Sequence, residues 1–379
     1  MTSVLFAGGG TGGHLYPGLA IARALVRLDP SVRPFFVGAR RGIEREVLPT
    51  TEFPHELLDL HPLYRRQPWN NWRTLVGAVG AWRRIGAIVA RERPAAIVGT
   101  GGYASALALA YALVHRIPYV LQEQNSHAGL TMRLFARRAR EIYLGFPEAS
   151  AGLRVGADTV VADSGNPIEP PPVPRPDRAA ARRAWGLPPD GRVLLVFGGS
   201  QGAVAINDVV AAWLAAGRRP ADLDVVWATG RVSYERHRAL EGPRVVVRPY
   251  LSPIRDAYAI TDLAIARAGA MATAELCAWG IPAILVPLPT AAADHQTANA
   301  RALAQAGAAL LLPQGELTVD RLDATVRALL TDESRFAALA AGATARGRPE
   351  AADVIARRLA GVMGGKDGRA DGSRGRSTG

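Results

Sequence analysis

The sequence has a single cysteine and no long hydrophobic run. Cys277 has no partner for a disulfide within the chain, which agrees with a reducing compartment. The uncharged stretch that comes nearest to a membrane-spanning helix, residues 94–114, is interrupted by glycine and hydroxyl residues, whereas such a helix needs about 20 mostly apolar residues. The N-terminus lacks the basic segment that opens a signal peptide. We therefore expect no transmembrane helix and a chain that stays in the cytosol.

Sequence motifs of several enzyme classes are missing. There is no Gly-x-Ser-x-Gly, no Walker A motif, and no set of histidines and cysteines at metal-ligand spacing. Asp222-Leu223-Asp224 resembles the paired-carboxylate metal motif of some glycosyltransferases, but we expect it at the start of a strand, away from the ligand-binding edge. These absences argue against hydrolase and P-loop chemistry, and they predict neither a metal nor a cofactor.

Acidic residues are fewer than basic ones, 33 against 45, which gives a net charge of +12 and a pI near 10.6. The densest basic segment is 61–93, which contains seven arginines and one acidic residue, Glu92, and so has a net charge of +6. The segment 364–379 adds only +2. Such an excess predicts nucleic acid or an anionic membrane surface as a partner.

Three apolar runs lead into glycine-rich turns and then into helix-like stretches: residues 4–7, 96–98 and 193–197. Short buried strands that alternate with helices predict parallel α/β sheets, because parallel neighbours need a crossover connection. The first and third runs are interpreted as the opening strands of two Rossmann-like domains, in keeping with a length of 379 residues and 49% hydrophobic residues.

Proline marks the boundary between the two domains. Residues 165–176 contain six prolines and cannot form a helix interior or a central strand, so we interpret them as the linker. The predicted organisation is an N-terminal domain, a linker, a C-terminal domain, a C-terminal helix and a disordered tail, over residues 1–164, 165–176, 177–345, 346–363 and 364–379.

The first glycine turn, Gly8-x-Gly10-x-x-Gly13, matches the dinucleotide fingerprint, which cradles phosphate on backbone N–H groups. NAD also needs an acidic residue at the end of the second strand, where this chain has Arg40 and Arg41 instead. These arginines suit the extra phosphate of NADP, so an NADP-dependent oxidoreductase is one alternative. His14 follows the turn, where a neutral imidazole can accept a proton from a substrate hydroxyl; the alternative is a structural histidine.

Two segments of the second half carry polar groups at predicted strand ends. Gly269-Ala270-Met271 should begin a helix whose backbone donors face an anion, and Glu275 either caps that helix or accepts hydrogen bonds from ribose. Asp294-His295-Gln296-Thr297-Ala298-Asn299 follows the next strand at the same edge of the sheet. The two segments together predict a crevice for a small polar ligand.

The basic segment is interleaved with aromatic residues, which suits the surface of an anionic membrane. The docking candidates are Tyr64, Arg65, Arg66, Trp69, Trp72 and Arg73, with Arg133, Arg137, Arg138 and Arg140 as an extension. Trp72, Leu75, Val76 and Val79 share one helix face, which would equally suit packing on the sheet. A nucleic-acid site uses the same residue types, so composition leaves that alternative open.

Six motifs occur in one order along the chain: Gly8-Gly9-Gly10-Thr11-Gly12-Gly13-His14-Leu15-Tyr16-Pro17, Gly99-Thr100-Gly101-Gly102-Tyr103, Glu123-Gln124-Asn125 with Ala128-Gly129-Leu130-Thr131, Gly165-Asn166-Pro167, Gly198-Gly199-Ser200-Gln201-Gly202 and Asp294-His295-Gln296-Thr297-Ala298-Asn299. Together they resemble the MurG family, whose members convert lipid I to lipid II in peptidoglycan synthesis with UDP-N-acetylglucosamine as donor. The resemblance implies a GT-B fold, with two Rossmann-like domains whose parallel sheets face a central cleft. It places the acceptor on the N-terminal domain and the nucleotide sugar on the C-terminal one.

The resemblance also implies roles for individual residues. Thr11, Gly12, Gly13 and Asn125 would face the reacting sugars, and Ser200, Gln201 and Gly202 would hold the diphosphate with Ala270, Met271 and Ala272. The backbone near Leu251 would meet the uracil, Glu275 beside Thr273 and Ala274 would bind the ribose, and Gln296 and Asn299 would lie at the donor sugar. The chain departs from the family pattern at Gln122, Glu169 and Ala272, which we expect to tune affinity.

By the same resemblance the reaction is an inverting transfer to the 4-hydroxyl of the lipid-linked acceptor, with His14 as the candidate base. Backbone donors would stabilise the leaving UDP, so no metal is required for this role. The enzyme would be peripheral at the cytoplasmic face of the membrane, where its partners are lipid I and other cell-wall synthesis proteins. A nucleic-acid-binding module leaves the converging glycine loops unexplained, so nucleic acid is not an expected partner.

Overall fold

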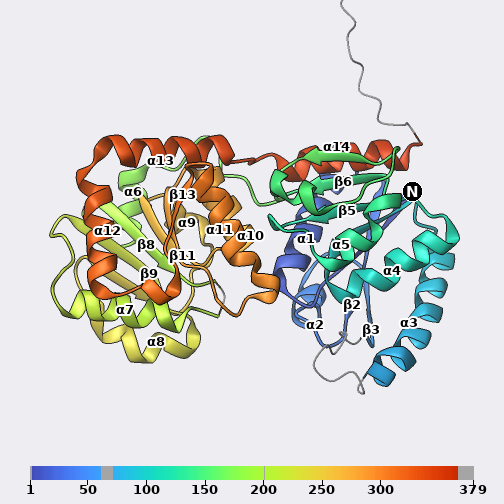
Figure 1. Cartoon of the computed structure of the whole chain (residues 1–379), viewed down its shortest axis with the longest axis horizontal. Coiled ribbons are helices and arrows are strands. Elements are labelled where there is room, and N and C mark those ends of the chain that lie inside the picture. Colours follow the sequence, from blue (N-terminus) through green and yellow to red (C-terminus); the bar gives the residue numbers. More distant parts are fainter. Residues whose placement is uncertain (1, 61–70, 200, 366–379) are drawn as a thin grey trace, which may run out of the picture.

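The computed structural model describes residues 2–60, 71–199 and 201–365, which form two α/β domains beside each other (Figure 1). The N-terminal domain has a seven-stranded parallel sheet in the order β3-β2-β1-β4-β5-β6-β7. Its strands are β1 (Thr2–Gly8), β2 (Val32–Ala39), β3 (His55–Leu58), β4 (Ala96–Gly101), β5 (Tyr119–Glu123), β6 (Glu141–Leu144) and β7 (Val160–Asp163).

Helices cover both faces of this sheet: α1 (Gly12–Leu28), α2 (Glu44–Val47), α3 (Asn71–Glu92), α4 (Gly102–His115) and α5 (Leu130–Phe135). Successive residues of β1 point to opposite faces, so Leu5 packs in a core with Ile85 and Leu109, while Phe6 packs in another with Leu19. A sheet buried on both faces explains why its strands read as continuous apolar runs.

The C-terminal domain has a six-stranded parallel sheet in the order β10-β9-β8-β11-β12-β13. Its strands are β8 (Arg192–Phe197), β9 (Leu223–Ala228), β10 (Val245–Arg248), β11 (Leu263–Ala266), β12 (Ala283–Leu285) and β13 (Ala309–Leu311). Its helices are α6 (Arg178–Ala184), α7 (Val204–Ala215), α8 (Arg231–His237), α9 (Arg255–Tyr258), α10 (Ala270–Trp279), α11 (His295–Gln305), α12 (Val319–Thr331) and α13 (Glu333–Arg346). The predicted class of two Rossmann-like domains with parallel sheets is confirmed.

The last helix, α14 (Ala351–Met363), returns to the N-terminal domain and lies against α1 (Figure 1). Ile355 and Leu359 are fully buried in the same core as Leu19. Arg358 Nε donates to Glu141 Oε2 of β6 at 2.6 Å, which adds a polar tie. The chain therefore crosses between the domains twice, through the proline-rich segment after β7 and again between α13 and α14.

The topology indicates where each domain can bind a ligand. Strand order reverses between β1 and β4 in the first sheet and between β8 and β11 in the second, and open α/β sheets bind ligands at the carboxyl ends of the strands at such points. The glycine-rich turns after β1 and β8 therefore lie at these two switch points of the strand order. Within the described ranges, none of the helices combines the length and the apolar character needed to cross a membrane.

Candidate active site

A buried carboxylate accepts a hydrogen bond from the turn between β1 and α1. Glu44 Oε1 accepts hydrogen bonds from Gly10 N at 2.8 Å and from Ala39 N at 3.2 Å, and the Glu44 side chain is fully buried. Gly10 has φ +88°, and a Cβ there would lie 2.9 Å from the Tyr103 ring, so glycine is required. Sequence reasoning missed Glu44, because its contact with Gly10 joins residues 34 positions apart.

His14 lies in the first turn of α1 and is only partly exposed. Its Nδ1 is 3.2 Å from Gly9 O and 3.2 Å from Thr11 Oγ1, and Thr100 Oγ1 donates to the His14 carbonyl oxygen at 2.6 Å. Burial lowers the pKa of His14 below its ordinary value of 6.5, although the contact with Gly9 acts in the opposite direction. The imidazole is therefore neutral at pH 7, and a proton on Nδ1 directed at Gly9 leaves Nε2 able to accept another.

Asn125 follows β5 and is oriented by Glu123. Glu123 Oε1 accepts from Asn125 N at 2.9 Å and from Asn125 Nδ2 at 3.3 Å, while Glu123 Oε2 accepts from Gly129 N at 2.8 Å. Burial raises the pKa of Glu123, and these hydrogen bonds oppose that shift. The predicted sugar-facing residue is therefore fixed in the N-terminal domain.

In the C-terminal domain, the turn after β8 leads into α7. Gly202 has φ +74°, and a Cβ there would lie 2.2 Å from Thr229 O, so only glycine allows this approach. No side chain caps α7, and its first turn carries no acidic residue, so its backbone N–H groups can face an anion. Gln201 is exposed beside this turn, and Ser200 lies outside the described residues.

The helix α10 follows β11, which is the neighbour of β8 in the sheet, and it packs on the opposite face of the sheet from α7. Gly269 precedes its first residue, Ala270, and no side chain caps this helix either. Met271 and Ala272 are partly exposed in its first turn, whereas the buried Thr273 hydroxyl bonds to the Gly269 and Ala270 carbonyl oxygens at 3.1 Å. Two helices without a side-chain cap therefore follow the two neighbouring strands β8 and β11, and the backbone N–H groups of such N-termini can bind an anion.

Glu275 lies in the second turn of α10 and does not cap the helix, so the capping interpretation is wrong. Tyr258 Oη donates to Glu275 Oε2 at 2.8 Å, and burial raises the pKa of Glu275. Leu251 is buried in the segment after β10. Tyr258 therefore engages one of the two carboxylate oxygens of Glu275.

Gln296 and Asn299 lie on α11, one turn apart. Gln296 Oε1 accepts from Leu288 N at 3.0 Å, which orients its carboxamide. Asn299 is fully buried and reaches the N-terminal domain, where Ser126 N donates to its Oδ1 at 2.8 Å. The motif predicted from sequence therefore lies at the junction of the two domains.

At two of the three positions that depart from the family pattern, the structure shows which side chain the residue contacts. Gln122 is buried, and its Nε2 donates to Asn166 Oδ1 at 3.1 Å. Glu169 pairs with Arg255 Nη1 at 2.5 Å, which offsets the repulsion that a carboxylate would exert on a diphosphate. Nothing in the structure explains the alanine at position 272.

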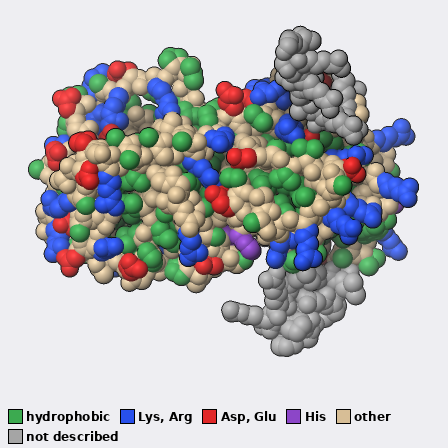
Figure 2. All heavy atoms as spheres, turned by 45° about the horizontal axis from the view of Figure 1, so that its top comes forward, with side chains coloured by type: hydrophobic (Ala, Val, Ile, Leu, Met, Phe, Trp, Pro, Cys, Tyr) green, Lys and Arg blue, Asp and Glu red, His purple; other side chains and the backbone are tan. Residues whose placement is uncertain are grey.

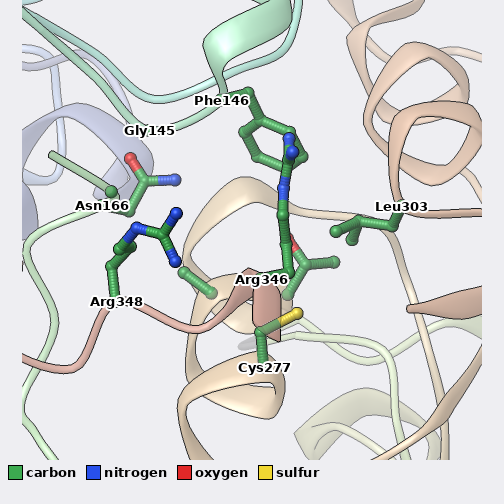
Figure 3. Close-up of a pocket in the computed structure, with 10 residues that line it drawn as sticks. Gly145, Phe146, Asn166, Cys277, Leu303, Arg346 and Arg348 are labelled. Carbon is green, nitrogen blue, oxygen red and sulfur yellow. The ribbon is translucent and has the colours of Figure 1, made fainter. Parts of the chain in front are cut away.

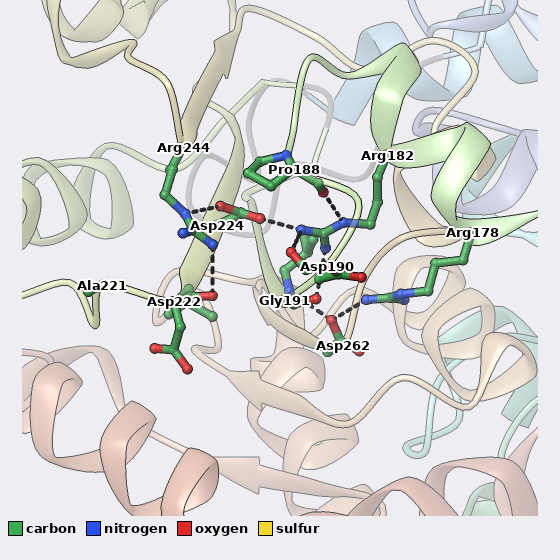
Figure 4. Close-up of polar contacts among 12 residues, drawn as sticks. Arg178, Arg182, Pro188, Asp190, Gly191, Ala221, Asp222, Asp224, Arg244 and Asp262 are labelled. Atoms are coloured by element: carbon green, nitrogen blue, oxygen red, sulfur yellow. Dashed lines mark hydrogen bonds and ion pairs between the residues drawn. The ribbon is translucent and has the colours of Figure 1, made fainter.

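Asp222 directly precedes β9 and Asp224 is its second residue, so both lie at the amino end of the strand, away from its carboxyl end, as expected (Figure 4). Asp224 is fully buried, with Arg244 Nε donating to one oxygen at 2.6 Å and Arg182 Nη2 to the other. Arg182 is also fully buried and donates to three carbonyl oxygens, at Pro188, Asp190 and Gly191. Both oxygens of Asp224 are therefore engaged by arginine.

Cys277 lies in a small cavity between the domains, together with Asn166, Arg346 and Arg348 (Figure 3). Burial raises the pKa of its thiol to about 12. Since the thiolate is the nucleophilic form, burial disfavours nucleophilic reaction at this cysteine.

Of the membrane-docking candidates, Tyr64, Arg65, Arg66 and Trp69 lie outside the described residues, as does the segment 366–379 of the predicted tail. Trp72 and Arg73 belong to α3, but their side chains are not among those described. Farther along α3, Val79 is 53% exposed, so at this position the apolar stripe does not pack on the sheet. Val114 of α4 is 65% exposed.

Both halves of the chain match family models, residues 4–144 that of the glycosyltransferase family 28 N-terminal domain and residues 193–355 that of its C-terminal domain. A protein of Salinibacter ruber, named UDP-N-acetylglucosamine–N-acetylmuramyl-(pentapeptide) pyrophosphoryl-undecaprenol N-acetylglucosamine transferase, is 42% identical over 360 residues, which cover 93% of this chain and 95% of that protein. The chain belongs to the MurG family. A MurG relative of the same name from Moorella thermoacetica is 39% identical, over 93% of this chain and 96% of its own.

Solved structures agree with the MurG assignment. The crystal structure of Acinetobacter baumannii MurG superposes with a TM-score of 0.74 at 26% identity, over 95% of this chain and 99% of that one. The calicheamicin glycosyltransferase CalG4 has a TM-score of 0.69 at 16% identity, over 96% and 98% of the two chains, which shows the fold alone. The MurG relatives are transferases and give no support to the NADP-dependent oxidoreductase.

Proposed function

We propose that this chain transfers N-acetylglucosamine from UDP-N-acetylglucosamine to the 4-hydroxyl of undecaprenyl-pyrophosphoryl-N-acetylmuramyl-pentapeptide, lipid I, and so produces lipid II. The proposal rests on two features: His14, whose pKa is lowered by burial, follows β1 at one switch point, and two helix N-termini without a side-chain cap follow β8 and β11 at the other. The first supplies a base and the second an anion site, which are the two groups that a direct displacement needs. The named relatives are transferases of this donor and acceptor.

In the proposed mechanism the diphosphate of the donor lies at the starts of α7 and α10, and its ribose hydroxyls donate to Glu275. His14 Nε2 takes the proton of the acceptor 4-hydroxyl as that oxygen attacks the anomeric carbon. The bond from the anomeric carbon to UDP breaks, and UDP leaves with the electron pair. Backbone N–H groups stabilise the charge that develops on the leaving oxygen, and the anomeric configuration inverts.

The test is UDP release from UDP-N-acetylglucosamine with and without a lipid I analogue, with the product checked for the new disaccharide. We expect release to depend on the acceptor and the disaccharide to form. Folded protein that neither binds the nucleotide sugar nor forms the disaccharide would contradict the proposal.

We further propose that the enzyme docks peripherally on the anionic cytoplasmic leaflet through the exposed apolar residues of α3 and α4. Trp82 and Tyr111, with ring centroids 5.0 Å apart, join the two helices there, near the exposed Val79 and Val114. A cavity at the C-terminal end of α4, where Leu113 lines it, is also lined by Arg116, Arg137, Arg138 and Arg140. Figure 2 shows basic side chains gathered over the N-terminal half of the molecule, which suits anionic headgroups.

The membrane proposal is tested by sedimentation with liposomes that contain anionic lipid. Replacing Arg65, Arg66 and Arg73, or Arg137 and Arg140, by glutamate should weaken binding, and salt should weaken binding of the unmodified chain. The matched control replaces Arg321 and Arg335 by glutamate, since both are exposed on the C-terminal domain. Equal binding by all variants would assign these arginines to ordinary solvated surface.

A further inference from the structure

Asn299 has its polar atoms engaged inside the protein. Its Oδ1 accepts from Ser126 N at 2.8 Å, and its Nδ2 donates to Asn125 Oδ1 at 3.1 Å and to Ala268 O at 3.2 Å. A carboxamide has two N–H donors, and both are used in these contacts. The side chain is also fully buried, so it is poorly placed to bind a sugar directly.

The partners of Asn299 belong to different domains. Asn125 and Ser126 follow β5 of the N-terminal domain, whereas Ala268 precedes α10 at the proposed diphosphate site. One buried side chain therefore joins the acceptor side of the cleft to the donor side. Its neighbour Asn166 makes a parallel tie, with Nδ2 2.9 Å from Gln124 O and 3.4 Å from Ala270 O.

The geometry of Asn125 depends on both domains. Glu123 holds its backbone N and its Nδ2 from one side, and Asn299 holds its Oδ1 from the other. The carboxamide plane of Asn125 is thus set by a chain of hydrogen bonds that ends at the carbonyl of Ala268. A shift of α11 relative to β5 would turn this plane.

We propose that Asn299 is a positioning residue, which holds Asn125 at a fixed distance from the segment 268–270 so that the acceptor hydroxyl meets the donor sugar. This inference rests on the proposed transferase function. Misplacement of reacting groups by about 1 Å can lower a rate by about 100-fold, so a residue that touches neither substrate can still control turnover.

The first test is Asn299→Asp, which preserves shape and an acceptor for Ser126 N. Its second oxygen faces Asn125 Oδ1 and Ala268 O, so two donated hydrogen bonds become two repulsive contacts. We expect kcat to fall about 10- to 100-fold, while the Kd for UDP changes less than about twofold. The control is Asp224→Asn, a buried substitution at the opposite edge of the sheet, which should lower the melting temperature and leave kcat of the folded enzyme unchanged.

A double-substitution cycle shows whether Asn299 acts through Asn125. We expect the variant that combines Asn125→Ala with Asn299→Asp to turn over no more slowly than Asn125→Ala alone. An additive loss together with a weaker Kd for UDP would overturn the proposal in favour of direct donor contact. A lower melting temperature with unchanged kcat would overturn it in favour of a purely structural role.

A measurement without substrate separates this inference from the proposed function. The Ser126 amide donates to Asn299 Oδ1, so its hydrogen exchange should be faster in Asn299→Ala than in the unmodified chain. Unchanged exchange would contradict the tie itself. If the unmodified chain lacks transferase activity, the function proposal fails, while the exchange measurement still reports on the contact.

Discussion

The two edges of the C-terminal sheet differ in whether their polar groups are paired within the protein. At the amino edge, Asp224 lies between Arg182 and Arg244, and Arg182 also satisfies three carbonyl oxygens. At the carboxyl edge, α7 and α10 begin without a side-chain cap. Since a buried charge is tolerated only when it is paired, the charges at the amino edge, which we call the closed edge, serve stability. The carboxyl edge, which we call the open edge, leaves the backbone N–H donors of α7 and α10 for a substrate. Charge density alone therefore does not locate a site.

The largest effect that the comparison predicts is a loss of turnover when His14 is replaced, a residue of the N-terminal domain. His14→Ala should lower kcat by about 10²- to 10⁴-fold, because the acceptor hydroxyl loses its base. UDP binding should be unchanged, since the donor site lies in the other domain. Single-turnover rates measure the first quantity and calorimetric titration the second; near-normal turnover would assign the proton to another group or to solvent.

The pH profile sharpens this prediction. Burial lowers the pKa of His14, and the neutral form is the base, so kcat/KM should stay level through pH 7 and fall only at a pH below the ordinary value of 6.5. In His14→Gln the same acid limb should disappear. An acid limb above pH 6.5 in the unmodified enzyme would contradict the role assigned to His14.

At the closed edge, Asp224→Ala should act on stability instead. It leaves the buried guanidinium of Arg182 without its carboxylate and should cost about 3–5 kcal/mol. Denaturant unfolding of the full chain measures this loss in the free energy of unfolding. The kcat per folded molecule should be unchanged. A selective loss of kcat with normal stability would erase the contrast between the two edges.

Glu275→Gln should have a smaller effect, at the open edge. Hydrogen bonds to a charged group are stronger than neutral ones by about 1 kcal/mol, so the affinity for UDP-N-acetylglucosamine should fall about five- to tenfold. Because burial raises the pKa of Glu275, affinity should weaken as the pH falls through that raised value. In Glu275→Gln this pH dependence should be absent. Titration calorimetry at several pH values checks both effects, and a pH dependence that persists would assign it elsewhere.

The sequence predicts those features that depend on residues close to one another along the chain. Apolar strands, glycine turns after strands and the proline-rich connection lie within a few residues of one another, so the two sheets and the crevice motifs could be expected. Glu44 could not, because it reaches Gly10 only after β2 and α2 pack beside β1. The role of Asn299 is hidden for the same reason, since its partner Ser126 is 173 positions away.

The return of α14 to the first domain has a consequence for synthesis. Leu19 and its neighbours on α1 remain without their cover until Ile355 and Leu359 have been made, because these residues share one core. Domains generally fold as units while the chain leaves the ribosome, N-terminal first. Here the domain that begins first is completed last, so a nascent chain carries an exposed apolar face through nearly all of its translation.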